Sequence, residues 1–534
     1  MSSTGTGGWR AFLVNLGVIL LGSLLFAASF PNLLAENGIS ILAWIAFVPV
    51  FWVIHRVSLP ASVFFGALYG YTAYGLFNYW LSVFHPLAGL IVGSIYLFYF
   101  AVLFPLLKLA SILFPRKGYI LQWLLWIAYE YLRTLGFLGY PYGIAGYSQW
   151  QALPVVQIAN IFGVWGVSAL LVFPSAYGAA ALKDAGSARQ PLAFLSRERV
   201  AGIVWVIALA ASLCYGFASP VDYSEAPTVR FALVQHNTDP WRGGIADYRH
   251  NYETLKRLSL EAMAAYPKPD MVVWSETAFV PRIYWHTVYR DDPESWALVK
   301  ELLAFLETQD VPYIIGNDDA RREVNAAGVW DRVDYNAVML FEGGQNTELY
   351  RKLHLVPFTE HFPYEKQFPW VYNALKNADT HFWKKGDTAT VFDAGGVKFS
   401  TPICFEDIFG YLSRNFVRNG AEVIVNLSND AWSKSLPAQM QHLSMAVFRA
   451  VENSRSMVRS TASGQTCAID PSGRVLAMAE PFTETQLTAA VPVITRQTLY
   501  TRWGDLWAKL FTAAAAIMLI LGIGLSIMRK GRNR

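Results

Sequence analysis

Three polar side chains of complementary chemistry, Glu276, Lys352 and Cys404, each follow a strand-like run of the chain. A glutamate can take the proton from a thiol and return it later. A lysine ammonium can favour the thiolate and stabilise the oxyanion of a tetrahedral intermediate. The thiolate can then carry an acyl group as a thioester. Together, these residue types predict nucleophilic catalysis with Cys404 as the nucleophile.

Each of these residues, taken singly, has a simpler structural explanation. Most free cysteines are small buried hydrophobes, Glu276 could be a solvated strand-end carboxylate, and Lys352 could be a surface lysine. Glu360 and Glu406 are further carboxylates close to the lysine and the cysteine in the sequence, and each could be a structural ion-pair partner. The functional interpretation therefore depends on all of them meeting in one place.

The remaining cysteines and the nearby histidines indicate no metal site. The chain has three cysteines, Cys214, Cys404 and Cys467, and they form no Cys-x-x-Cys pair. Neither a disulfide framework nor a zinc site follows from this pattern. His354 and His361 lie in the same segment as the lysine but lack metal-ligand spacing with further carboxylates. We expect no metal and no cofactor, and we expect Cys467 to be a spectator.

The elements that must position these residues alternate between short β-branched runs and polar helical stretches, which indicates an α/β layered domain. Side chains at strand ends in such a domain converge at one edge of a sheet. The expected strands cover residues 229–235, 271–274, 313–316, 337–341, 397–403, 422–427, 457–461 and 475–478, and the expected helices cover 246–265, 293–309 and 438–455.

Much of the remaining chain is apolar enough to lie in lipid. The 534 residues are 54% hydrophobic and 15% charged, which is unusual for a soluble protein. Segments long enough to cross a bilayer are expected near residues 11–30, 38–55, 61–84, 87–114, 119–136, 152–181, 200–218 and 507–528. The fourth and sixth segments are long, and we expect them to be tilted or interrupted near Pro105 and Pro174.

The distribution of basic residues predicts the orientation of these spans, because lysine and arginine accumulate in cytoplasmic loops. With the N-terminus inside, seven spans place residues 220–500 outside the cytoplasm, and the eighth returns the C-terminus to the inside. A cleavable signal peptide ending near Ala27-Ala28-Ser29 is the alternative, but it would invert this span count. The net charge is only +4 and the basic residues are scattered, so no nucleic-acid partner is expected. The basic residues on the predicted inner side are Arg10, Arg56, Arg116, Lys117, Lys183, Arg189, Arg197, Arg199, Arg529, Lys530, Arg532 and Arg534.

The motifs around the three residues resemble those of a known superfamily. Glu276 after a strand, Lys352 in Arg-Lys-Leu-His-Leu-Val-Pro-Phe-Thr-Glu-His-Phe-Pro, and Cys404 in Ile-Cys-Phe-Glu-Asp resemble the Glu-Lys-Cys triad of the nitrilases. Seven spans before such a domain and one after it resemble the bacterial apolipoprotein N-acyltransferases. The resemblance extends to Tyr-Pro-Tyr-Gly-Ile-Ala-Gly-Tyr-Ser-Gln at residues 140–149 and Asn-Leu-Ser-Asn-Asp-Ala-Trp at 426–432.

This resemblance implies a fold with three parts. Residues 1–222 would form a transmembrane bundle of seven helices. Residues 223–498 would form a nitrilase-like domain, an αββα sandwich, on the periplasmic or outer side. Residues 499–534 would form the eighth transmembrane helix and a basic cytoplasmic tail. The protein would be a multi-pass protein of the bacterial cytoplasmic (inner) membrane, with both termini cytoplasmic, and a monomer.

The resemblance also implies a two-step acyl transfer in lipoprotein maturation. Cys404, activated by Glu276, would attack the sn-1 ester of a phospholipid such as phosphatidylethanolamine and form a thioester. The α-amine of the N-terminal diacylglyceryl-cysteine of an apolipoprotein would then take the acyl chain. Lys352 would stabilise both oxyanions.

Four further residues receive roles from the same resemblance. Glu360 and Glu406 would be auxiliary carboxylates, Phe405 would supply a backbone N–H and part of the pocket wall, and Trp241 would be an aromatic residue at the pocket entrance. Phe405, Asp407 and Cys467 differ from residues that are frequent in the family. The aromatic residues Trp370, Tyr372, Phe382 and Trp383 suggest a lid or membrane-dipping loop after Glu360.

Three other functions remain open at this point. A membrane-tethered hydrolase would use the same triad with water as the acceptor. A transporter or lipid-binding protein would carry an inactive outer domain, but it would also show paired charges or broken helices in repeated halves. An acyltransferase could also serve an acceptor other than a lipoprotein.

Overall fold

The computed structural model describes residues 5–84, 88–183, 189–324, 328–377 and 380–532. The chain divides into two compact units. The helical unit comprises Met1–Pro220, Ser435–Ser444 and Trp503–Arg534, and the α/β unit comprises Val221–Lys434 and Met445–Arg502.

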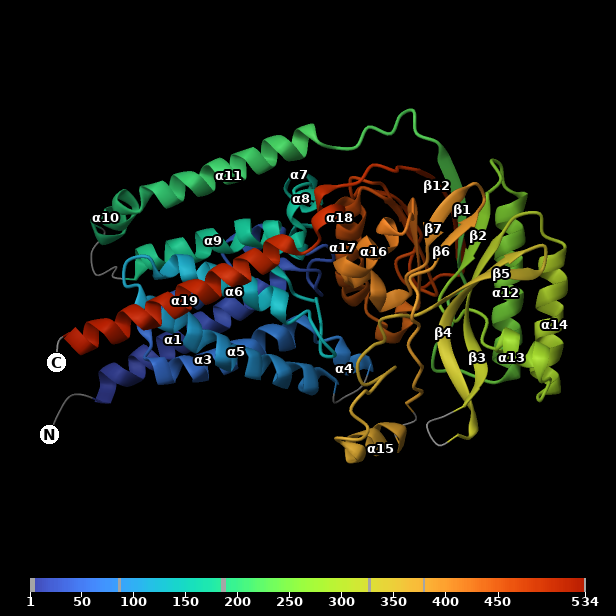
Figure 1. Ribbon diagram of the computed structural model, residues 1–534, viewed down its shortest axis with the longest axis horizontal. Coiled ribbons are helices and arrows are strands. Elements are labelled where there is room, and N and C mark those ends of the chain that lie inside the picture. The colour runs from blue at the N-terminus through green and yellow to red at the C-terminus, as the bar shows by residue number, and fades with distance from the viewer. Residues whose placement is uncertain (1–4, 85–87, 184–188, 325–327, 378–379, 533–534) are drawn as a thin grey trace. The chain divides into compact units, whose positions relative to one another are not determined.

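The helical unit contains, among the described residues, five helices that are long and apolar enough to cross a membrane. They are α1 (Gly5–Ser29), α5 (Ala88–Leu113), α9 (Val164–Leu182), α11 (Arg199–Ala218) and α19 (Leu506–Arg532) (Figure 1). The unit also contains α2 (Val48–Arg56), α3 (Leu59–Phe77), α4 (Leu81–Phe84), α6 (Gly118–Leu132), α7 (Leu153–Val156), α8 (Ala159–Phe162), α10 (Arg189–Arg197) and the 3₁₀ helices Ser40–Trp44 and Ala145–Gln149.

The other three expected spans are not among these five helices, so the number eight stays a prediction. The second is divided between the 3₁₀ helix and α2, the third is the 19-residue α3, and the fifth is the 15-residue α6. Of the two expected alternatives, an interruption at Pro105 or Pro174 is wrong, because α5 and α9 run through these prolines, and a tilt stays a prediction. The sixth segment breaks instead at Gly163, whose φ of +66° lies in the left-handed region that glycine tolerates.

Helices α3 and α5 pack closely because two glycines of α3 lie at their contact. A Cβ atom at Gly66 would lie 2.2 Å from the carbonyl oxygen of Phe100, and one at Gly70 would lie 2.2 Å from that of Tyr96. Two small residues four positions apart let helix backbones approach in a membrane, where association depends on van der Waals packing. The Gly-x-x-x-Gly spacing in α3 therefore determines this contact.

The α/β unit contains two six-stranded sheets, each with three parallel strands flanked by antiparallel ones. The order in the first sheet is β12 (Thr485–Pro492), β1 (Thr228–Gln235), β2 (Met271–Trp274), β3 (Tyr313–Val324), β4 (Trp330–Glu342) and β5 (Gln345–Arg351). The order in the second sheet is β11 (Val475–Met478), β10 (Cys467–Ile469), β9 (Ser456–Thr461), β8 (Val423–Ser428), β7 (Val397–Ser400) and β6 (Val391–Ala394).

The two sheets face each other, and helices cover their outer faces (Figure 1). Strands β1, β2 and β12 contact β9, and the Ser460 hydroxyl of β9 donates to the carbonyl oxygens of Val234 (3.3 Å) and Val273 (3.0 Å) in the first sheet. This arrangement matches the expected αββα sandwich. The helices of the unit are α12 (Ile245–Ala264), α13 (Ile283–Val288), α14 (Pro293–Glu307), α15 (Pro369–Asn377), α16 (Gly410–Arg418), most of α18 (Leu499–Trp503) and the second half of α17 (Leu436–Asn453).

Candidate active site

The turn that presents Cys404 is held by the neighbouring strand β8. The Asn426 side chain of β8 donates from Nδ2 to the carbonyl oxygens of Pro402 (3.1 Å) and Cys404 (3.3 Å). Cys404 opens a 3₁₀ helix and has a φ of +49°, in the left-handed region. Such a conformation is unfavourable for a residue with a side chain and is found mainly where the surroundings enforce it. Cys404 as a whole residue is half-buried.

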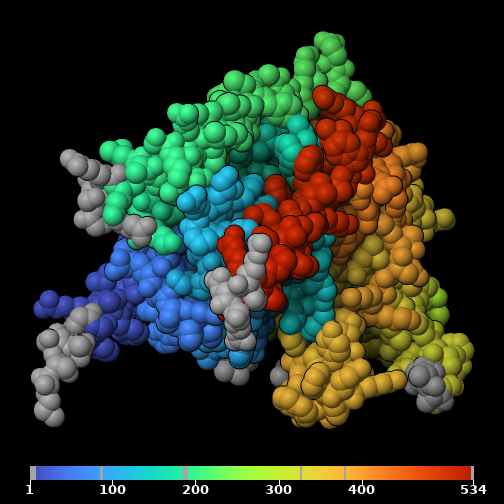
Figure 2. All heavy atoms as spheres, turned by 60° about the vertical axis from the view of Figure 1, so that its left-hand side comes forward, coloured from blue at the N-terminus to red at the C-terminus, as the bar shows by residue number. Residues whose placement is uncertain are grey.

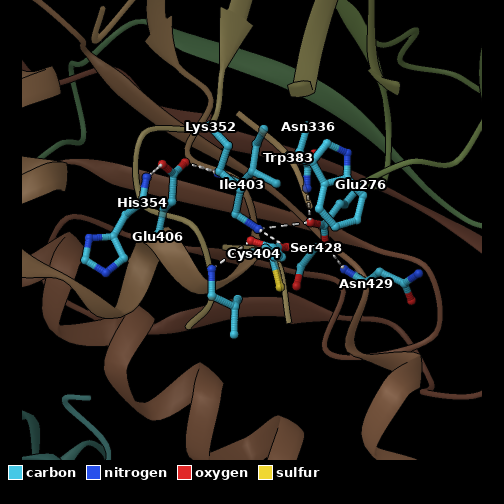
Figure 3. Close-up of polar contacts among 12 residues, drawn as sticks. Glu276, Asn336, Lys352, His354, Trp383, Ile403, Cys404, Glu406, Ser428 and Asn429 are labelled. Atoms are coloured by element: carbon cyan, nitrogen blue, oxygen red, sulfur yellow. Dashed lines mark hydrogen bonds and ion pairs between the residues drawn. The ribbon is translucent and has the colours of Figure 1, made fainter. Parts of the chain in front are cut away.

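Lys352 lies buried between two carboxylates, directly after β5. Its Nζ is 3.3 Å from Oε1 of Glu276 (Figure 3). The same Nζ is 2.9 Å from Oε1 of Glu360. Only 1% of the side chain of Lys352 is exposed. A buried ammonium needs such partners, because desolvation of an unpaired charge is costly. The structure thus brings Glu276 together with Lys352 and Glu360, which lie far from it in the sequence.

Glu276 follows β2, and both of its oxygens accept hydrogen bonds. Asn336 of β4 donates from Nδ2 to Oε1 at 2.8 Å, and the backbone N–H of Asn429 donates to Oε2 at 3.0 Å. These contacts orient the carboxylate. The sequence analysis did not identify Asn336, although a buried asparagine among apolar residues of a strand is an unusual choice that signals a specific partner.

Glu406 joins the cysteine turn to the segment that follows Lys352. It accepts from the backbone N–H groups of Ile403 (2.8 Å), Leu353 (2.7 Å) and His354 (2.9 Å). The Tyr350 hydroxyl also lies 2.8 Å from both of its oxygens. Burial raises the pKa of Glu406 to about 7, although these donors oppose the shift. Glu406 therefore holds the cysteine turn and the segment after Lys352 together.

Electrostatics keep the Cys404 thiol protonated in the resting site. Burial raises its pKa well above the ordinary value, and the charge of Glu276 raises it further against the effect of Lys352. Burial alone would lower the pKa of Lys352, but the charges of Glu360 and Glu276 outweigh it and raise this pKa. The site therefore holds a neutral thiol beside a charged ammonium, so forming the thiolate requires a base.

A buried chain of polar groups behind the cysteine was also missed by the sequence analysis. Arg459 of β9 forms ion pairs with Asp407 and, at 3.4 Å, with Asp430, and all three are nearly inaccessible to solvent. The Ser428 hydroxyl donates to Asp430 at 2.9 Å, and Ser428 also forms a side-chain hydrogen bond with Cys404. Asp407 thus has a structural role, as the partner that compensates a buried arginine.

Phe405 and Trp241 lie at different depths. The Phe405 side chain is buried, with its ring 5.1 Å from that of Phe409. The Trp241 side chain is 56% exposed, and its ring meets that of Trp432 edge-on at 5.2 Å. The structure thus places Phe405 in the interior beside the cysteine turn and Trp241 at the surface.

The aromatic segment after Glu360 is anchored at its far end. Trp383 donates from Nε1 to Oδ1 of Asp318 at 3.1 Å, and its backbone N–H donates to the carbonyl oxygen of Glu360 at 3.0 Å. The rings of Tyr372 and Phe382 stack at 5.3 Å. Trp370 in α15 is 72% exposed. In the described part of the chain, no group of three or more His, Cys, Asp or Glu residues could hold a metal ion.

Two protein-family models match parts of this chain. Residues 230–500 match the carbon-nitrogen hydrolase family, and residues 22–177 match the N-terminal domain of apolipoprotein N-acyltransferase. A carbon-nitrogen hydrolase from Helicobacter pylori, 17% identical, covers 50% of this chain and 89% of its own, with a TM-score of 0.36.

Similar curated proteins cover nearly the whole chain. Apolipoprotein N-acyltransferase 1 of Treponema denticola is 46% identical over 97% of both chains. Apolipoprotein N-acyltransferase 1 of Treponema pallidum is 47% identical over 95% of both chains. A Geobacter metallireducens apolipoprotein N-acyltransferase is 31% identical over 94% of both chains. This chain, an acyltransferase of the nitrilase superfamily, therefore belongs to the apolipoprotein N-acyltransferase family.

Proposed function

We propose that the enzyme moves an acyl chain from the sn-1 position of a phospholipid to the N-terminal amine of a diacylglyceryl apolipoprotein, through a thioester on Cys404. The observation that carries this proposal is the buried Lys352 ammonium held between Glu276 and Glu360 beside a protonated thiol. A neutral thiol needs a base to become nucleophilic, and a charged ammonium can stabilise an oxyanion.

In the first step, Glu276 takes the thiol proton as the sulfur attacks the carbonyl carbon of the sn-1 ester. The ammonium of Lys352 stabilises the oxyanion. The bond from this carbon to the glycerol oxygen then breaks, and the proton on Glu276 passes to that oxygen. The products are a Cys404 thioester and a lysophospholipid, with phosphatidylethanolamine as the proposed donor.

In the second step, the free α-amine of the acceptor cysteine attacks the thioester carbonyl carbon. The C–S bond breaks, an amide forms, and Glu276 carries the amine proton to the sulfur. Glu360 compensates the Lys352 charge throughout, Glu406 and Phe405 shape the turn and wall around the nucleophile, and Trp241 borders the entrance.

The same proposal includes a location and a domain plan. Residues 1–222 and 499–534 would supply eight transmembrane helices of a bacterial inner-membrane monomer. Residues 223–498 would face the periplasmic side, and both termini would lie in the cytoplasm. The apolar helices and the basic residues at the predicted inner ends of the spans support this plan.

Peptide mass spectrometry after incubation with phosphatidylethanolamine, and then with a diacylated lipopeptide, tests the reaction. We expect a hydroxylamine-labile acyl adduct on Cys404 that moves to the lipopeptide amine. Cys404→Ala should form no adduct, and Cys467→Ala, which changes a buried thiol of β10, is the matched control that should retain activity. An adduct that water discharges as fast as the lipopeptide does would instead favour a hydrolase.

A further inference from the structure

A cavity in the helical unit carries chemistry that the acylation site does not use. It lies between the end of α5 and the last turns of α19 and has a volume of about 410 Å³. Figure 2 shows the C-terminal helix in red lying across the cyan segment of the chain, and α19 contacts both α5 and α6. The cavity is lined by Ile112, Leu113, Phe114, Gly522, Leu525, Ser526, Arg529 and Lys530.

The side of this cavity that Phe114, Gly522 and Leu525 line is apolar. Gly522 lies against the Phe114 ring, since a Cβ atom at this position would lie 2.7 Å from Cε2 of Phe114. Gly522, Ser526 and Arg529 follow one another at a spacing of three to four residues, which places them on one face of α19. Ile112 and Leu525 add exposed aliphatic surface. Such a wall suits a hydrocarbon chain.

The opposite side of the cavity, near the end of α19, is cationic. Arg529 and Lys530 line it, while Arg116 and Lys117 follow Phe114 by two and three residues and are exposed. Among the described residues, none of these four side chains forms an ion pair with an acid. The carbonyl end of α5 contributes only about half a negative charge. The mouth of the cavity therefore has a net positive charge.

We propose that this cavity binds an anionic phospholipid, with its phosphate at Arg529 and Lys530 and one acyl chain along Ile112, Phe114 and Leu525. Basic pockets between transmembrane helices at the cytoplasmic side suit anionic headgroups. A zwitterionic lipid would bring its own ammonium group toward the two cations. A soluble phosphate would leave the apolar wall uncovered. The site shares no residue with the proposed reaction and would bind a lipid that is not consumed.

Native mass spectrometry of the purified full-length protein in a neutral detergent tests this site. We expect phosphatidylglycerol to bind more tightly than phosphatidylethanolamine, and sn-glycerol 3-phosphate not to compete. The double variant Arg529→Gln/Lys530→Gln should weaken phosphatidylglycerol binding roughly 30-fold, since each cation contributes about fivefold at an anionic surface. The matched control Arg10→Gln/Arg199→Gln removes two exposed basic side chains outside the cavity and should leave this binding unchanged.

A second variant separates a bound lipid from diffuse attraction to basic residues. Ser526→Phe fills the cavity and retains both cations, so it should also abolish the preference for phosphatidylglycerol. Unchanged binding in Ser526→Phe, equal binding of the two lipids, or full competition by glycerol phosphate would each overturn the proposal. Size-exclusion profiles of each variant verify that it folds. If the double variant does not fold, Lys530→Gln alone takes its place, with an expected fivefold loss of phosphatidylglycerol binding. Acyl transfer by the same preparations tests the proposed reaction separately.

Discussion

The thiol of Cys404 lies beside the carboxylate of Glu276, and the negative charge of Glu276 raises the pKa of the thiol. This effect gives Glu276 two opposed influences. As a base it would generate the thiolate during the reaction, and as a fixed negative charge it disfavours the thiolate at rest. The two influences can be separated by an experiment that measures thiol reactivity and turnover in the same variant.

Glu276→Gln should slow turnover strongly and yet make the thiol more reactive. Without the negative charge, the pKa of Cys404 falls, so alkylation by iodoacetamide should begin at lower pH than in the native enzyme. Turnover should fall by about 10²- to 10⁴-fold because the base is lost. Peptide mass spectrometry of Cys404 alkylation across pH measures the first effect. Glu294→Gln, at the start of α14, is the control, and an unchanged alkylation profile in Glu276→Gln would contradict this account.

Glu406→Gln should loosen the turn that carries the nucleophile. The carboxylate accepts from three backbone N–H groups and one hydroxyl, and an amide would direct an N–H₂ group at these donors. We expect a loss on the order of 1–3 kcal/mol in the free energy of unfolding. The thermal midpoint of unfolding in detergent should fall accordingly, while Glu301→Gln at the surface of α14 serves as the control for losing an acid.

The raised pKa of Glu406 also predicts how the thermal midpoint of unfolding depends on pH. The pKa of Glu406 rises from 4.5 to about 7 on folding, so its protonation stabilises the folded state below pH 4.5. This contribution is lost as the pH rises through 7. The native midpoint should therefore decline over this window, and the Glu406→Gln midpoint should lack that part of the decline. Parallel curves for the two proteins would contradict the assignment.

At the scale of elements, the contact between α3 and α5 depends on the absence of side chains. Gly66→Val would place methyl groups against the Phe100 backbone, so the helices must separate, and we expect destabilisation on the order of 2–4 kcal/mol. Gly75→Val in the same helix is the control, because a Cβ there meets nothing within 4 Å. Thermal unfolding monitored by circular dichroism should lower the midpoint for Gly66→Val alone. Equal shifts in the two variants would show that valine in this helix, and not the contact, is responsible.

The strands that the sequence predicted are apolar runs, whereas the missed strands include the short β6 and β10 and the mostly polar β5. Strands β2 and β11 have the predicted bounds. Strand β5 was missed because Gln345–Arg351 is mostly polar and lies at the edge of its sheet, where only one side needs apolar contacts. The motifs identified Glu276, Lys352 and Cys404, whose catalytic roles stay predictions. They did not identify Asn336, because the position of β4 in the sheet, separated from β2 by β3, depends on tertiary structure.

At the scale of the whole molecule, the predicted orientation places the α/β unit and the loop after α5 on opposite sides of the membrane. In a background lacking native cysteines, Thr347→Cys in β5 and Lys117→Cys before α6 provide exposed reporters. We expect a membrane-impermeant maleimide to label the first in cells with a permeabilised outer envelope, and the second only after lysis. The reverse pattern would invert the topology.

The division of the triad between the two sheets has a consequence for biogenesis. Glu276 and Lys352 follow strands of the first sheet and Cys404 follows a strand of the second, while β12, made last, completes the first sheet by pairing with β1. A nascent chain thus possesses the nucleophile long before the sandwich can close. Under the proposed mechanism, acyl transfer would therefore begin only after β12 has paired with β1.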